Sequence, residues 1–193
     1  MHNVILFGAP GSGKGTQAQL LAQKYHYYHI STGDILRKEI AGLTELGKAA
    51  KAVVDAGKLV PDPLVIAIVE GNILKNKDFF QGVIFDGFPR TRDQAAALDQ
   101  MLVKLHTTIH QVIYLEVPVE ELIKRIGLRA QTSNRSDDND LTIINARIKE
   151  YNDKTEPVLA YYRQQGKYEK VIGIGTVEDI NVRVCAAIDQ FKA

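Results

Sequence analysis

Apolar positions along this chain follow two different periods. Short apolar runs rich in β-branched and aromatic residues alternate with longer stretches in which apolar residues recur every three or four positions. The short runs are bounded by glycine, proline or polar residues, a pattern typical of strands buried on both faces. The predicted strands are 4–7, 28–30, 83–86, 112–115 and 170–174. The predicted helices are 14–24, 33–41, 45–56, 63–75, 91–105, 118–128, 138–164 and 176–191.

The alternation of strands and helices predicts an α/β fold. Helices then cover both faces of a mostly parallel five-stranded sheet, a three-layer sandwich whose ligands bind at the carboxyl ends of the strands. Two stretches interrupt the alternation: residues 31–60 hold two predicted helices where one crossover would suffice, and residues 130–140 are polar. We therefore expect one core domain with two small inserts, which suits a chain of 193 residues.

Composition and charge exclude several classes of function. Lysine and arginine number 24 against 23 aspartates and glutamates, whereas a general nucleic-acid or membrane-surface binder needs a basic excess on one face. The apolar run that ends at Gly8 is too short for a signal-peptide core, and no later run approaches ~18 residues. With Cys185 as its single thiol, the chain has no disulfide framework and no thiolate zinc site. We expect a cytoplasmic protein with no nucleic-acid or membrane partner.

A glycine-rich loop, GAPGSGKGT at residues 8–16, follows the first predicted strand and leads into a helix. Its glycines let backbone N–H groups turn toward an anion, and Lys14 can reach the β- and γ-phosphates of a nucleotide. The alternative is a glycine-rich turn without a ligand, which the order of strand, loop, lysine and helix disfavours. Because Gly15 replaces the usual Ser or Thr and Thr16 follows it, we expect Mg²⁺ to be held largely through water.

Other charged residues suggest a metal shell and a second anion site. Asp86 ends the predicted strand 83–86, where a carboxylate suits a Mg²⁺-bound water; a turn cap is the alternative. Arginine binds phosphate with a planar fork, although a solvated surface position is the alternative for any single arginine. The arginines in suggestive positions are Arg37, Arg90, Arg125, Arg129, Arg135 and Arg147. A guanine-specific N-K-x-D motif is not matched, because the nearest segment, 76–78, has its aspartate one residue too early. This combination favours a kinase of a small acceptor.

Four motifs stand in the order and spacing found in adenylate kinases, at residues 8–16, 30–37 (ISTGDILR), 57–62 (GKLVPD) and 85–91 (FDGFPRT). The chain resembles the bacterial short-lid kind over nearly its whole length. The resemblance implies an enzyme that reversibly transfers the γ-phosphoryl group of MgATP to AMP, giving two ADP, in adenine nucleotide homeostasis and salvage. The sequence has no obvious long exposed apolar stripe, which favours a monomer. The implied parts are a P-loop core of residues 1–30, 61–128 and 136–193, a nucleoside-monophosphate-binding insert at 31–60, and a short lid at 129–135.

The same resemblance implies the site residues. ATP would contact Gly11, Ser12, Gly13, Lys14, Gly15, Thr16, Arg125, Arg129 and Gly175. AMP would contact Thr32, Arg37, Lys58, Leu59, Val60, Gly87, Phe88, Pro89, Arg90, Gln94, Arg135 and Arg147. The implied catalytic residues, which share the charge of the transferring phosphoryl group, are Lys14, Arg90, Arg135 and Arg147. Asp34 and Asp86 would contact the water shell of Mg²⁺. Asp137 and Asp138 would act in a hinge or pair with arginines, and a charge at a helix N-terminus is the alternative.

Two other functions remain open at this stage. Against a UMP/CMP kinase stand Thr32 and Gln94, because a buried amide discriminates strongly between bases. Against a phosphate-binding or switch protein without transfer activity stands the second anion site. No nucleophile is expected, and the histidines, which lie outside the motifs, are expected to be solvated or packed: His2, His26, His29, His106 and His110. Ala130 and Asn134 stand where short lids often carry glycine, and such lids bind no zinc.

Overall fold

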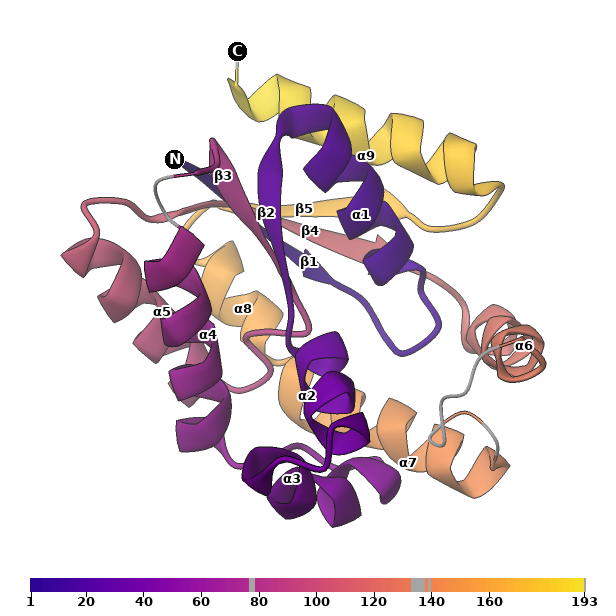
Figure 1. The fold of residues 1–193 in the computed structure, drawn as a ribbon. Coiled ribbons are helices and arrows are strands. Elements are labelled where there is room, and N and C mark those ends of the chain that lie inside the picture. Colours follow the sequence, from indigo (N-terminus) through magenta and orange to yellow (C-terminus); the bar gives the residue numbers. More distant parts are fainter. Residues whose placement is uncertain (77–78, 133–137, 139, 193) are drawn as a thin grey trace.

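The computed structural model describes residues 1–76, 79–132, 138 and 140–192 (Figure 1). Several predictions fall outside these residues. They concern the end of the N-K-x-D lookalike, the second half of the expected lid and two charged site residues: Lys77, Asp78, 133–135, Arg135 and Asp137.

A five-stranded sheet forms the centre of the molecule. The strands are β1 (His2–Phe7), β2 (Tyr27–Ser31), β3 (Gly82–Asp86), β4 (Ile109–Glu116) and β5 (Tyr168–Ile172). They lie in the order β2-β3-β1-β4-β5, and all four neighbouring pairs are parallel. The predicted α/β class and five-stranded parallel sheet are confirmed.

Alternating residues of β1 build two separate cores. Val4 and Leu6 pack with α1 (Lys14–Tyr25) and α9 (Val177–Lys192), which cover one face of the sheet (Figure 1). Ile5 and Phe7 pack in a second cluster on the opposite face. That cluster includes residues of α4 (Asp62–Asn76), α5 (Arg92–Lys104) and α8 (Val158–Arg163), and it extends to Leu36 and Ala50 in the two helices of the expected insert. The result is the expected three-layer sandwich, and it explains why the β1 sequence is apolar at nearly every position.

The prediction that every strand is buried on both faces is wrong for β5. All residues of β3 are buried, but Lys170 and Ile172 of β5 are exposed. The difference follows from position, because β5 is an edge strand that pairs only with β4.

The two helices predicted within 31–60 are confirmed as α2 (Thr32–Ala41) and α3 (Glu45–Asp55). The Ser31 hydroxyl accepts from the Asp34 N–H at 3.3 Å and caps α2. Gly57, with φ of 69°, follows the end of α3 in the left-handed region that glycine favours. The chain then turns back toward the sheet and enters α4.

A single helix over 138–164 was predicted and is not found. The segment instead forms α7 (Leu141–Glu150), a π-helical turn at Tyr151–Thr155 and the short α8. Asp140 caps α7 by accepting from the Thr142 N–H at 2.7 Å, so Asp138 lies before the helix. Pro157 precedes α8 and has no N–H group to continue an α-helical ladder, which accounts for the interruption.

The remaining helix, α6 (Val119–Ala130), begins after Pro118 as predicted. No helix in the described ranges is both long and apolar enough to cross a membrane.

Candidate active site

The glycine-rich loop connects β1 to α1 at the carboxyl edge of the sheet. Gly11 and Gly13 have φ of 87° and 89°, and Gly13 is the residue before α1, so no side chain caps this helix. A Cβ on Gly11 would lie 2.8 Å from the Leu122 carbonyl oxygen, which shows how closely the loop approaches α6. The buried Ser12 hydroxyl has no hydrogen-bond partner among the described residues. Uncapped N–H groups and an unpaired buried hydroxyl suit an anion.

Lys14 is the first residue of α1, and its ammonium group is enclosed by the loop. Its Nζ lies 3.4 Å from the Ala9 carbonyl oxygen. Burial lowers the pKa of Lys14 to about 8, Asp86 opposes this, and Arg90 and Arg147 lower it further. An incoming phosphate would strongly stabilise the charged form of a lysine held in such a place.

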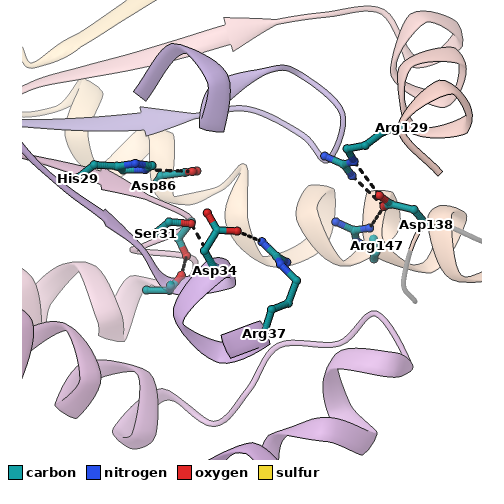
Figure 2. Close-up of polar contacts among 10 residues, drawn as sticks. His29, Ser31, Asp34, Arg37, Asp86, Arg129, Asp138 and Arg147 are labelled. Atoms are coloured by element: carbon teal, nitrogen blue, oxygen red, sulfur yellow. Dashed lines mark hydrogen bonds and ion pairs between the residues drawn. The ribbon is translucent and has the colours of Figure 1, made fainter. Parts of the chain in front are cut away.

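Asp86 lies at the carboxyl end of β3 and faces α1. Its side chain is 9% exposed, and a Cβ on Gly15 would lie 3.3 Å from its Oδ2. His29 Nε2 lies 3.5 Å from Oδ2 (Figure 2). Burial alone would raise the pKa of Asp86, but the His29 imidazole and the Lys14 ammonium outweigh it and hold that pKa below its usual range. Asp86 is therefore an anion, placed beside the loop that is expected to bind phosphates.

The sequence suggested that His29 is either solvated or packed, but the structure places it beside a carboxylate. It contacts Asp86 because β2 pairs with β3 and sets Ser31 beside Asp86 at the end of the sheet. The signal could not be found in the sequence, since the two residues are brought together only by strand register.

Asp34 and Arg37 neutralise each other on α2. Arg37 Nη2 donates to Asp34 Oδ1 at 2.5 Å, and the Asp34 side chain is half-exposed (Figure 2). An arginine expected to contact AMP is thus held by a carboxylate expected near the metal.

Asp138 gathers two arginines from different helices. Its Oδ2 accepts from Arg129 Nε at 2.7 Å, and its Oδ1 accepts from Arg129 Nη2 at 2.8 Å and from Arg147 Nη1 at 2.7 Å (Figure 2). Its side chain is fully buried. Burial would raise the pKa of Asp138, but the Arg129 and Arg147 guanidinium groups outweigh it and lower that pKa. Of the three possibilities given for Asp138, pairing with arginines is the one observed.

A cleft opens beside Lys14, with about 1030 Å³ of empty space when the open solvent at its mouth is included. Its lining contains every described residue expected to contact AMP: Thr32, Arg37, Lys58, Leu59, Val60, Gly87, Phe88, Pro89, Arg90, Gln94 and Arg147. Glu150, Tyr151 and Thr155 also line it, carried there by the end of α7 and the π-helical turn. No sequence motif pointed to these three, because the turn replaces a helix that was expected to be regular.

The other residues expected to contact ATP lie around the loop rather than in this cleft. Arg125 Nη1 lies 3.5 Å from the Ser12 carbonyl oxygen, and Arg125 Nε donates to Glu121 Oε1 at 2.8 Å. Gly175, with φ of 116°, is exposed in the turn between β5 and α9.

A directly bound metal finds no protein cage in the described part of the chain, where no three His, Cys, Asp or Glu side chains gather at ligand spacing. Asp86 faces the phosphate loop at Gly15. A hydrated ion that contacts Asp86 through water fits this donor set.

Comparison with known proteins decides the family. A family model described as adenylate kinase matches residues 6–167. The chain belongs to the adenylate kinase family. This confirms the resemblance found in the four motifs, and it makes the chain a phosphotransferase between ATP and AMP.

Individual adenylate kinases are similar over essentially the full chain. That of Bacteroides fragilis is 48% identical over 189 residues, covering 98% of this chain and 99% of the relative. That of Parabacteroides distasonis is 47% identical over 192 residues, covering 100% of both chains. That of Flavobacterium johnsoniae is 46% identical over 190 residues, covering 98% of this chain and 100% of the relative. The similarity to adenylate kinases therefore extends over essentially all of this chain.

Proposed function

We propose that the cleft binds AMP, that the glycine-rich loop binds the phosphates of ATP, and that the phosphoryl group passes between them beside Lys14. The observation that carries this proposal is the meeting of Lys14, Arg90 and Arg147 in one cleft that Thr32 and Gln94 also line. The three cations converge from α1, the segment before α5, and α7.

Transfer between two phosphates needs no nucleophile from the protein. It needs the two nucleotides in line and neutralisation of the charge on the transferring group. Lys14, Arg90, Arg147 and the undescribed Arg135 would supply that neutralisation. Arg147, which is paired with Asp138 in this structure, would turn its guanidinium toward a phosphate when one binds. Asp138 would keep its hydrogen bonds from Arg129.

The residues present fit Mg²⁺ held through water, with Asp86 as the principal contact and Asp34 as a second one. When bound with ATP, the ion neutralises charge on the β- and γ-phosphates. Asp86 is suited to this role because it is ionised and faces Gly15.

We further propose that residues 31–60 act as the monophosphate-binding insert and 129–135 as the lid, both closing over the substrates to exclude water. We also propose that the protein is a monomer and serves adenine nucleotide homeostasis in the cytoplasm. Its one cysteine is free and buried, which fits a reducing compartment.

A coupled assay tests the proposal by offering ATP with AMP, CMP, UMP and GMP in turn. We expect AMP to be preferred strongly, and hydrolysis of MgATP without AMP to be negligible beside transfer. Equal use of UMP or CMP would contradict the base assignment, and rapid hydrolysis of ATP alone would contradict closure over the reacting group.

Thr32→Ala is expected to admit CMP and UMP better. The Thr32 hydroxyl donates to the Gly87 carbonyl oxygen at 2.8 Å in the wall of the cleft, and the side chain is 2% exposed. Its removal leaves space in the wall and takes one of two donors from that carbonyl, which keeps the hydrogen bond from Arg90 Nε at 2.8 Å. The ratio of kcat/KM for AMP over CMP should therefore fall about tenfold. The exposed Thr142→Ala is the matched control. An unchanged ratio in Thr32→Ala would mean that the insert does not hold the monophosphate as proposed.

Binding of ATP is expected to take up protons above pH 8. The pKa of Lys14 is lowered to about 8 in the free protein, and a bound phosphate raises it. Below pH 8 the ammonium is already protonated, so uptake is small; at pH 9 it approaches about one proton per ATP, and affinity falls as pH rises. Titration calorimetry in two buffers of different ionisation enthalpy measures the uptake. Lys14→Met should abolish this component, and equal uptake in both proteins would rule out Lys14 as its source.

A further inference from the structure

Asp62 begins α4, directly after the proposed insert, and no role has been given to it above. Its two carboxylate oxygens accept separate hydrogen bonds from α5 and the residue that caps it. Gln94 Nε2 donates to Asp62 Oδ1 at 2.7 Å, and Thr91 Oγ1 donates to Asp62 Oδ2 at 2.6 Å. Asp62 does not line the cleft, whereas Gln94 does. Of its two hydrogen-bonding partners, Gln94 is the one that lines the cleft, so Gln94 is the direct link between Asp62 and a bound nucleotide.

The amide of Gln94 is held at both ends. The Arg90 backbone N–H donates to Gln94 Oε1 at 2.7 Å, while Nε2 donates to Asp62. A backbone N–H can only donate and a carboxylate can only accept, so these two partners decide which end of the amide is oxygen and which is nitrogen. The opposite orientation would set two donors against each other and an oxygen against the carboxylate. Because Gln94 is 1% exposed, water would not relieve either conflict.

The hydrogen-bonding capacity left over on Gln94 is one lone pair of Oε1 and one N–H of Nε2. An amide with these two groups free, in fixed order, complements a purine edge that presents an amino donor beside a ring-nitrogen acceptor, as adenine does. A 6-oxopurine presents the reverse order, an acceptor beside a ring N–H. A fixed amide rejects it, whereas an amide able to flip accepts it.

The Asp62 carboxylate is itself held in place by Thr91. Thr91 caps α5 by accepting from the Gln94 N–H at 3.2 Å while its own O–H donates to Asp62. Asp62, Thr91 and Gln94 thus form a closed set of hydrogen bonds between the first residue of α4 and the first turn of α5.

We propose that Asp62 is a positioning residue that fixes the orientation of the Gln94 amide and so makes the cleft select 6-aminopurine over 6-oxopurine monophosphates. This inference rests on the proposed function, in which Gln94 contacts the base.

The test compares kcat/KM for AMP and IMP, with ATP as donor, in Asp62→Leu, Gln94→Leu and the double variant. Asp62→Leu keeps the branching of the side chain at Cγ, with a larger volume, and offers no acceptor. We expect its preference for AMP over IMP to fall at least about tenfold, with KM for AMP raised and KM for ATP unchanged. In the Gln94→Leu background the same change should cause no further loss of preference. Asp62→Asn keeps one acceptor oxygen and should stay within about threefold of the original preference.

Asp93→Leu is the matched control, since it removes an exposed carboxylate one residue before Gln94. Loss of activity by the same factor for AMP and IMP in Asp62→Leu, or a further loss in the Gln94→Leu background, would overturn the proposal. If Gln94→Leu itself kept the preference for AMP, the base contact in the proposed function would fail instead. If Asp62→Leu does not fold, Asp62→Ala makes the same comparison with a smaller side chain.

Discussion

Lys14→Met is expected to lower kcat for transfer from ATP to AMP by about 100- to 1000-fold, the usual cost of removing one preorganised charge from a transition state. Lys14 lies at the junction of the glycine-rich loop, the cleft and Asp86, where burial has already lowered its pKa to about 8. Methionine keeps most of the side-chain volume, so the loop should retain its shape. The measurement is steady-state kinetics with saturating AMP and ATP, accompanied by a thermal unfolding curve.

Lys24→Met provides the control for this substitution, because Lys24 lies in the last turn of the same helix and is exposed. It should leave kcat unchanged. Near-normal turnover in a folded Lys14→Met protein would refute the mechanism, since no other described cation lies beneath the loop in the same way.

Arg147→Met is the second change with a large expected effect, a fall in kcat of about 100-fold, or about 3 kcal/mol of transition-state stabilisation. Arg147 reaches the cleft from α7 and its side chain is 16% exposed, so its guanidinium acts where little water competes. The fold should tolerate the change because Asp138 still accepts two hydrogen bonds from Arg129. Kinetics with each nucleotide varied in turn will separate a loss in kcat from a change in KM.

Two further variants sharpen this prediction. Arg147→Lys keeps the charge but loses the planar fork, so its kcat should lie between those of the original protein and Arg147→Met. Lys149→Met removes a cation from the exposed side of the same helix, where its side chain is 74% exposed, and should have no effect. If Lys149→Met and Arg147→Met behaved alike, the loss would reflect α7 rather than a contact with phosphate.

The parts of the fold that could be predicted from the sequence are those set by neighbouring residues. The strand expected at 4–7 lies within β1 and is buried on both faces, and the helix expected at 45–56 is found as α3, so both expectations, which rest on neighbouring residues, are confirmed. One error came where the environment of an element mattered: the exposure of Lys170 depends on β5 lying at the edge of the sheet. The other, the single helix expected over 138–164, has a local cause, because Pro157 has no N–H group to continue the α-helical ladder.

The sequence by itself determined the glycine-rich loop, the class of fold and the family, because strand, loop, lysine and helix are consecutive and their geometry is local. Tertiary structure alone decided the pairing of charged and amide groups that lie far apart in the sequence. His29 meets Asp86 across 57 positions of chain through the pairing of β2 with β3, while Gln94 meets Asp62 across 32 positions. Residue types set which hydrogen bonds a group can make, but only folding brings a donor within reach of one particular acceptor.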